Sequence, residues 1–429
     1  MSSRTKFVVV MSSTCLVALL LLGAVVSKGA PAEGESPAVV ADNNVYKHLE
    51  VYSEVLSRIK SEYVEEPNMS SVTLGAMNGL LESIDPYASY LNAEQYKEYL
   101  KNYDTYRGSL GMVLAKKFGY VTVVSVVPGS PAAKVGLTTG DMLESIKGIA
   151  TRDMPLAYAQ LLLKGQPGST VEMSVLRRKP EPQKLTLTRE VVVFPPVESK
   201  LLPDAIGYIK IPSMSHGDVK EVAAAVASLE KQGAKKLILD VRYSASGTPE
   251  DGIDLANLFL NKGLITYTQG QKWPRKNFDA DPSKDITSLP LIVMTNHGTA
   301  GAAELAAGAL QGDKRASLVG ERTYGDASVL RPISMDDGSA IILSVAKYYT
   351  PDGKSIQDNG VTPGEIVIEP DPTTDDGPDP SQASPSVAAP LRPVSRLPDG
   401  SKAQANPDAD KSPVDDPILQ KAIQLAQSK

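Results

Sequence analysis

The sequence predicts an α/β protein of several domains. Three observations support this prediction: apolar runs alternate with amphipathic helical patterns in the C-terminal half, the segment from Tyr106 to Glu190 contains many short strand patterns, and the segment before it is helical. A chain of 429 residues is long enough for two to three domains with a sizeable core.

Charge, cysteine content and motif content give no support to several classes of function. The chain has 44 Lys and Arg against 50 Asp and Glu, and a net charge of -6 gives no electrostatic reason to expect nucleic acid. Cys15 is the single cysteine, so no intramolecular disulfide is possible. The sequence contains no phosphate loop, zinc-spaced Cys and His set or carboxylate cluster, and therefore predicts neither a metal nor a cofactor.

Residues 1–30 have the pattern of an export signal. Arg4 and Lys6 precede an apolar run from Phe7 to Val26, and small residues follow it. The run is long enough to span a bilayer and no clean A-x-A site follows, so a cleaved signal peptide and a signal anchor in the inner membrane both fit. We therefore expect the protein in the periplasm or cell envelope, with residues 31–44 as a flexible linker.

Residues 45–105 are expected to be helical. Apolar residues recur at helical spacing in two segments, the second of which ends at Asp85-Pro86. These apolar positions are Leu49, Tyr52, Val55, Leu56 and Ile59, then Leu74, Met77, Leu80 and Leu81. A further short helix is expected from Ala93 to Tyr99. We interpret the apolar stripes as packing surfaces.

Two motifs characterise the segment from Tyr106 to Glu190. It opens with the loop RGSLGM, and SVVPGSPAAKVGLTTGDMLESIKG follows. Both resemble a circularly permuted PDZ domain, in which a peptide pairs with a sheet edge and loop N–H groups hold its carboxylate. The resemblance implies protein or peptide C-termini as partners and a peptide-binding loop of Gly108, Ser109, Leu110, Gly111 and Met112. Leu110, Met112 and Leu161 are candidates for the pocket that takes the last side chain of the peptide, and plain core packing is the alternative for each.

The stretch from Leu291 to Asp326 is the candidate catalytic platform. An apolar run predicts a buried strand, a turn with Gly298 follows, and an Ala-rich helix is expected from about Ala302 to Leu310. The N-terminus of such a helix offers unpaired N–H groups to a developing oxyanion. The side chains of the turn with acid, base or hydroxyl capacity are His297, Thr299 and Glu304.

Several motifs in this order resemble the carboxyl-terminal processing peptidases, which are tail-specific serine proteases with a PDZ domain. The motifs are GLLESIDPYASYL, NHGTAGAAE at the platform, GERTYGD after the next strand, and GSAIILSVAKYYTPDGKSIQDNGVTP. The resemblance implies a crotonase/Clp-like α/β protease core over residues 191–370. Members of this family use a serine and lysine dyad.

Both dyad positions are altered in this chain. Gly301 stands where the family has its nucleophilic serine, and Asp326 where it has the lysine base; Glu304, which in the family orients the dyad, is retained. Glycine supplies no nucleophile, and a carboxylate at position 326 places negative charge where an oxyanion must be tolerated. We interpret Thr299 as a turn hydroxyl bonded to backbone and His297 as a solvated turn residue.

The turn that in the family contributes to the oxyanion hole has changed as well. A buried strand, Lys235 to Arg242, runs into this turn, which in the family reads D-L-R-x-N-P-G-G. Here the turn extends from Tyr243 to Gly247, and Gly247 alone remains of the glycine pair as an oxyanion candidate. Ser244 and Ser246 are interpreted as turn hydroxyls, because no lysine or histidine follows within the turn.

The C-terminal part completes the expected organisation. Residues 371–415 are rich in Pro, Asp, Ser and Ala and are expected to be disordered, and the last segment contains DPILQKAIQLA, which resembles the family's final helix. Lys347 and Lys354 occupy ordinary framework positions, so neither is a displaced catalytic lysine. The expected boundaries are therefore 1–30, 31–44, 45–105, 106–190, 191–370, 371–415 and 416–429.

Two functions of different class follow from these observations. The residues at positions 301 and 326 favour an exported, peptide-binding pseudopeptidase, either as a homo-oligomer or paired with an active relative. The alternative is an active serine-type endopeptidase that cleaves periplasmic or envelope proteins. It would use a nucleophile outside the family pattern or one donated by a partner subunit.

Overall fold

The structure, a computed structural model, describes residues 43–102, 107–117, 119–152, 154–177, 181–214, 217–369 and 416–428. The chain divides into two compact units, Met1–Val72 and Thr73–Lys429. The expected export signal and the expected disordered segment, residues 371–415, lie outside the described residues. Within those ranges, no helix has the length and apolar character needed to cross a bilayer.

The first unit contains α2 (Asn43–Glu62), which carries the predicted apolar stripe. Tyr52, Leu56 and Ile59 are half-buried along it, whereas Leu49 and Val55 are exposed, so the interpretation of the stripe as a packing surface is wrong for these two residues. The next helix, α3 (Met69–Glu82), begins after Asn68, whose Oδ1 accepts a hydrogen bond from the N–H of Ser71 at 3.1 Å. Asparagine is a preferred N-cap because it satisfies an N–H group that the helix leaves unpaired.

Two short elements follow α3: β1 (Ser89–Leu91) and α4 (Ala93–Asn102). Asn92 caps α4, since its Oδ1 accepts the N–H of Gln95 at 2.9 Å and the Gln95 side chain accepts the N–H of Asn92 at 3.1 Å. The strand β1 was not predicted, because three residues are too few to show a periodicity.

The segment after residue 106 forms an antiparallel sheet with the order β2-β3-β4-β6-β7, in which β5 also pairs with β4. Its strands are β2 (Met112–Lys117), β3 (Tyr120–Val126), β4 (Met142–Ile146), β5 (Ile149–Ala150), β6 (Thr170–Leu176) and β7 (Gln183–Thr188). The one-turn helix α5 (Pro131–Lys134) and the longer α6 (Leu156–Leu163) complete it. The edge of β2 that does not face β3 is unpaired in this sheet.

A six-stranded sheet forms the centre of the C-terminal region. Its order is β17-β14-β13-β10-β9-β8, and all neighbours are parallel except β8 and β9. The strands are β8 (Glu198–Leu202), β9 (Ile206–Lys210), β10 (Lys236–Asp240), β13 (Leu291–Thr295), β14 (Ala316–Gly320) and β17 (Glu365–Ile366). The residues that follow the parallel strands therefore meet at one edge, where ligands of open α/β sheets bind.

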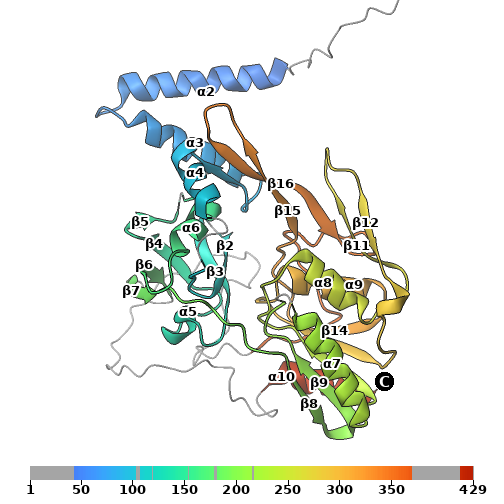
Figure 1. The fold of residues 1–429 in the computed structure, drawn as a ribbon. Helices are drawn as coiled ribbons and strands as arrows, with labels where there is room; N and C mark the ends of the chain where they lie inside the picture. The colour runs from blue at the N-terminus through green and yellow to red at the C-terminus, as the bar shows by residue number, and fades with distance from the viewer. Residues whose placement is uncertain are drawn as a thin grey trace, which may run out of the picture. The chain divides into compact units, whose positions relative to one another are not determined.

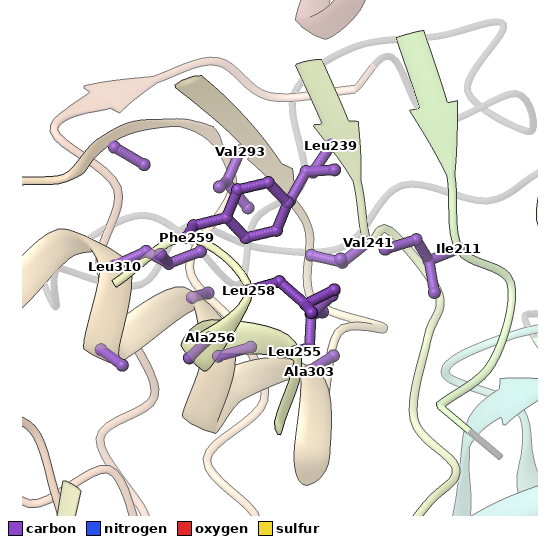
Figure 2. Close-up of a cluster of buried hydrophobic side chains, with 14 of the residues drawn as sticks. Ile211, Leu239, Val241, Leu255, Ala256, Leu258, Phe259, Val293, Ala303 and Leu310 are labelled. Carbon is purple, nitrogen blue, oxygen red and sulfur yellow. The ribbon is translucent and has the colours of Figure 1, made fainter. Parts of the chain in front are cut away.

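Helices cover both faces of this sheet. One face carries α7 (Asp218–Lys231), α8 (Pro249–Asn257) and α9 (Ala302–Gly312), and the other carries α10 (Pro417–Gln427) (Figure 1). Side chains alternate along β13: Leu291 and Val293 join the first core cluster, whereas Ile292 and Met294 face α10. Figure 2 shows Phe259 at the centre of the first cluster, among side chains from β10, β13, α8 and α9.

A second antiparallel sheet joins β1 to this region. Its order is β1-β16-β11-β12, with β15 also paired to β16. The strands are β11 (Leu264–Gln269), β12 (Lys276–Asp279), β15 (Ser328–Ser334) and β16 (Ala340–Tyr349). Two 3-10 turns, η1 (Pro203–Ala205) and η2 (Pro282–Lys284), connect neighbouring elements.

The predicted α/β class with several domains is confirmed by these sheets. The predicted elements are present with small shifts: the Ala-rich helix continues to Gly312, and the C-terminal helix begins at Pro417. The strands β8, β11, β12, β15, β16 and β17 and the helix α8 were not predicted.

Candidate functional site

The predicted platform between β13 and α9 is a tight, buried turn. Asn296 and Thr299 are fully buried. The Oδ1 of Asn296 accepts hydrogen bonds from the N–H groups of Tyr243 (3.0 Å) and Gly298 (3.1 Å). The Oγ1 of Thr299 accepts the N–H of Asn296 at 3.1 Å and donates to the C=O of Val241 at 2.9 Å. The hydroxyl of Thr299 is thus occupied as both donor and acceptor in holding the turn.

Gly301 forms the N-cap of α9, with φ 59° and ψ -122°. Residues with a side chain adopt this conformation only with strain, whereas glycine adopts it freely. A Cβ built on Gly301 would meet only the C=O oxygen of Ala245, 3.9 Å away. The position therefore has room for a hydroxyl-bearing side chain but carries none. The nearest atom, the C=O oxygen of Ala245, is a hydrogen-bond acceptor and could not donate to an oxyanion.

Glu304 lies fully buried in the first turn of α9 and ties the platform together. Its carboxylate accepts hydrogen bonds from the N–H groups of Gly301 (3.0 Å), Gly325 (2.6 Å) and Asp326 (2.8 Å) and from the hydroxyl of Thr323. Burial raises the pKa of Glu304 to about 7; the hydrogen bonds from Thr323 and Asp326 oppose the rise, and the charge of Asp326 adds to it. Glu304 thus holds the loop after β14 against the start of α9.

Asp326 stands next to Glu304 at the position that the family resemblance assigns to the lysine base. Burial raises the pKa of Asp326 to about 6, and the nearby charges of Asp85 and Asp358 raise it further. Among the described residues, no hydrogen bond or cation reaches its carboxylate group. A carboxylate in these surroundings repels a developing oxyanion and provides no amine to deprotonate a serine.

The turn after β10, which contains the oxyanion candidate Gly247, is closely packed against its neighbours. Tyr243 has φ 59° and Gly247 has φ 110°. A Cβ at Gly247 would lie 2.2 Å from the C=O oxygen of Met214, with which Gly247 forms a bridge, so glycine is needed there for close packing. Ser244 is fully buried, and its Oγ has no hydrogen-bond partner among the described residues. The backbone C=O of Ser244 accepts a hydrogen bond from the N–H of Ala300 at 3.0 Å, and this bond joins the turn to the platform.

An ion-pair network that the sequence did not predict lies at the carboxyl ends of β10 and β17. Arg242 pairs with Asp240 (2.7 Å), Glu369 (2.6 Å) and Asp416 (2.8 Å). Burial opposes ionisation of Asp240, but the Arg242 guanidinium outweighs it and holds the pKa of Asp240 below its usual range. The hydroxyl of Tyr243 also donates to Glu369, at 2.8 Å. Because Asp416 is the N-cap of α10, the network connects the C-terminal helix to the turn beside the platform.

His297 has a partner that the sequence interpretation missed. Its side chain is more than half exposed, but Nδ1 lies 2.5 Å from Oε2 of Glu321. Burial acts to raise the pKa of Glu321, yet the hydrogen bond and charge of His297 outweigh it, so this pKa lies below its ordinary value. The imidazole also meets the ring of Tyr243 edge-on, 6.2 Å between centroids. The pair joins the carboxyl ends of β13 and β14.

The predicted peptide-binding loop is held in place at its start by two backbone bridges, Gly108 with Gly165 and Ser109 with Glu190. In the described part of the chain, the N–H groups of Leu110 and Gly111 make no hydrogen bond. Gly111 has φ 75°, and a Cβ there would lie 2.2 Å from Cβ of Ser130. The loop thus passes close to Ser130 and has two N–H groups without a hydrogen-bond partner among the described residues.

The free edge of β2 and the helix α6 flank this loop. Leu110 and Leu161 are buried, whereas Met112 is half-buried. Leu110 therefore contributes to the core of the antiparallel sheet as well as to the loop. An extended peptide added to the edge of β2 would lie beside Met112.

Arg189 supports the loop from the end of α6. Its buried guanidinium donates to the C=O groups of Leu162 (2.8 Å) and Leu163 (2.9 Å), where a cation meets the negative end of the helix dipole. A Cβ on Gly165 would meet the Arg189 side chain at 2.9 Å. Since Gly165 in turn pairs with Gly108, Arg189 positions the start of the loop.

Other charged groups near the platform are paired at the surface. Lys347 lies 3.1 Å from Asp358, and Lys354 lies 2.7 Å from Asp352. Within the described ranges, no three His, Cys, Asp or Glu side chains are grouped as metal ligands.

Comparisons with known proteins find matches for both the parallel-sheet region and the antiparallel-sheet segment before it. Residues 205–367 match the model of peptidase family S41, and residues 122–177 match a model of the PDZ domain. The carboxy-terminal processing protease CtpA of Bacillus subtilis is 32% identical over 362 residues, which cover 83% of this chain and 75% of that protein. The carboxyl-terminal-processing protease of Synechocystis is 33% identical over 321 residues, which cover 73% and 75%. A solved photosystem II D1 C-terminal processing protease aligns with a TM-score of 0.61 at 27% identity, covering 74% of this chain and 86% of that one.

Proposed function

The chain belongs to the carboxy-terminal processing proteases of peptidase family S41, and from that premise we propose that it binds peptide C-termini without cutting them. One observation carries the proposal: the N-cap of α9 is Gly301, and the polar groups beside it are the carboxyls of Glu304 and Asp326. A serine peptidase of this family needs a hydroxyl and a neutral amine at these places. The site offers neither.

The alternative, cleavage through a different nucleophile, has less support. Thr299 is fully buried and its hydroxyl is engaged with backbone on both sides. Ser244 is also fully buried, and its hydroxyl has no base beside it among the described residues. A nucleophile donated by a partner subunit would meet the two carboxyls in place of the family's lysine, and their negative charge would oppose the developing oxyanion.

The proposed peptide site is the groove that begins at Gly108. A peptide would add a strand to the free edge of β2, and its terminal carboxylate would accept hydrogen bonds from the N–H groups of Leu110 and Gly111. Affinity is expected to be modest, because ordering a flexible peptide offsets part of the contact energy. Amidating the peptide's C-terminus should weaken binding strongly, and equal binding of the amidated peptide would contradict carboxylate recognition.

We also propose that the folded part acts outside the cytoplasm, because Arg4 and Lys6 precede a long apolar run. A reporter enzyme that is active only after export, fused after Ala30, tests this. Activity confined to the cytoplasm would refute it.

The test of catalytic inactivity compares wild type, Gly301→Ser, Asp326→Lys and the double variant on an unfolded, apolar-tailed substrate. Wild type and both single variants should show no turnover, because a hydroxyl and its base act as a unit. The double variant should remain weak: a serine at φ 59° is strained by about 1–3 kcal/mol, and one missing oxyanion donor reduces the rate by about a hundredfold or more. An active family member serves as the positive control.

One outcome would overturn the proposal. Wild-type turnover that survives removal of contaminating proteases, persists in Thr299→Ser and is lost in Thr299→Val would make Thr299 a nucleophile. Thr299→Val keeps the shape of the side chain, and a thermal melt of each variant separates lost chemistry from lost folding.

A further inference from the structure

The hairpin of β11 and β12 carries a group of unneutralised cations at its tip. Lys272, Arg275 and Lys276 lie within five residues of one another. In the described part of the chain none of them pairs with a carboxylate. The sequence from Leu255 to Phe278 contains no Asp or Glu at all, although the whole chain has a net charge of -6. The tip is therefore a local positive patch on an acidic protein.

Two of these cations, Arg275 and Lys276, lie over aromatic rings, which hold them in place but carry no negative charge to neutralise them. The guanidinium of Arg275 lies over the ring of Tyr267, 3.7 Å from its centroid, and Tyr267 stacks on Tyr349 at 4.8 Å with an interplanar angle of 5°. The ammonium of Lys276 lies 4.8 Å from the centroid of Phe278. These contacts orient the charges and leave them free to meet an anion. Figure 1 shows the hairpin extending past α8 and α9.

The single tryptophan of the chain belongs to the same tip. Trp273 is half-buried, and its carbonyl accepts the N–H of Gly270 at 3.1 Å, which closes the turn. Indole rings concentrate at the boundary between lipid headgroups and acyl chains, and lysine and arginine beside them bind acidic headgroups. The combination of one indole with three unpaired cations is typical of a membrane-surface contact.

We propose that this tip, Gly270–Lys276, docks on the surface of an anionic lipid bilayer. Its three cations would lie at the phosphate headgroups and Trp273 at the interface. A nucleic acid fits less well, because base stacking needs open aromatic faces and the faces of Tyr267 are covered by Arg275 and Tyr349. This inference is independent of whether the chain cuts peptides.

Trp273 makes the proposal directly measurable, since all tryptophan fluorescence of the protein comes from the tip. The full chain is mixed with vesicles of phosphatidylcholine alone or with one third phosphatidylglycerol, each with brominated acyl chains that quench indole on contact. Quenching should occur on the anionic vesicles and fall as salt is raised. Because quenching reports Trp273 itself, it distinguishes docking of the tip from insertion of the N-terminal apolar run.

Charge variants complete the experiment. Each Lys or Arg near an anionic surface accounts for about a fivefold change in affinity. The triple tip variant, which combines Lys272→Gln, Arg275→Gln and Lys276→Gln, should therefore weaken docking about a hundredfold. Lys272→Gln alone, which removes no contact within the fold, should weaken it about fivefold. The matched control removes three exposed charges elsewhere by Lys220→Gln, Lys231→Gln and Lys235→Gln and should dock like wild type.

Three results would overturn the proposal. These are equal quenching on neutral and anionic vesicles, no quenching on either, and undiminished quenching in the triple tip variant. Equally tight binding of a soluble polyanion such as heparin would also count against it, because the tip would then be a general anion site.

Discussion

Replacing Asp326 with asparagine should stabilise the protein at alkaline pH and not at acidic pH. The carboxyl of Asp326 lies among other acids and has no cation partner among the described residues, whereas its N–H, which asparagine keeps, donates to Glu304 at 2.8 Å. The substitution therefore removes a charge and leaves the backbone contact. The asparagine side chain has nearly the same shape as the aspartate that it replaces.

The size of the effect follows from the pKa of Asp326, which folding raises from 3.8 to about 6. A carboxyl whose pKa is raised binds its proton more tightly in the folded state. Its cost to stability therefore grows as the pH rises from about 4 to about 6 and is constant at higher pH. A shift of about 2 units corresponds to about 3 kcal/mol at pH 8. The gain from Asp326→Asn should therefore be about 2–3 kcal/mol at pH 8 and only about 0.5 kcal/mol at pH 4. Glu304, with a pKa of about 7, titrates in the same window, and its pKa should fall when the charge beside it is removed.

Urea unfolding at pH 4 and pH 8, followed by the fluorescence of Trp273, measures this in the region that contains the platform. Asp279→Asn, an exposed substitution on the edge strand β12, is the matched control and should change stability by less than about 0.5 kcal/mol. If Asp326→Asn is no more stable than wild type at pH 8, or gains equally at both pH values, the burial of an unpaired charge at this position is refuted.

Three further substitutions test other contacts. Arg242→Ala strands the buried Asp240 and should lower the free energy of unfolding by about 3–5 kcal/mol, and an unchanged urea midpoint would show that the network does not stabilise the fold. Gly111→Ala places a Cβ 2.2 Å from Cβ of Ser130 at φ 75° and should abolish peptide binding in a fluorescence anisotropy assay, so retained binding would place the peptide elsewhere. Arg189→Gln should weaken peptide binding about tenfold by calorimetry while the Trp273-monitored urea midpoint stays the same, and equal affinity would remove its positioning role.

The sequence predicted the elements whose apolar residues are buried on a regular pattern. Strands β10 and β13 are continuous apolar runs because both of their faces are covered, and α9 is almost wholly buried. The edge strands β12 and β15 were missed, since exposed strands show no clear alternation of apolar and polar residues. The helix α8 did carry a signal: Thr248, Pro249 and Asp251 form a capping box with proline in the first turn.

The site was predictable where one motif holds its parts and unpredictable where distant segments meet. Position 301 and Glu304 lie in a single turn, so their proximity could be read from the chain. The contact between Arg242 and Asp416 joins residues 174 positions apart, and the pairing of His297 with Glu321 bridges two strands. Local patterns carry no information on which carboxylate a cation will meet across a fold.

The docked helix α10 shares one cation with the segment that follows the parallel sheet. Ile418, Leu419, Ala422 and Ala426 are buried against that sheet. Glu369, which follows β17, and Asp416, the N-cap of α10, both pair with Arg242, at 2.6 Å and 2.8 Å. The connection between residues 369 and 416 therefore starts and ends at a single side chain. Its length can change without displacing α10 from the sheet, because the helix is held by its own apolar face and by Arg242.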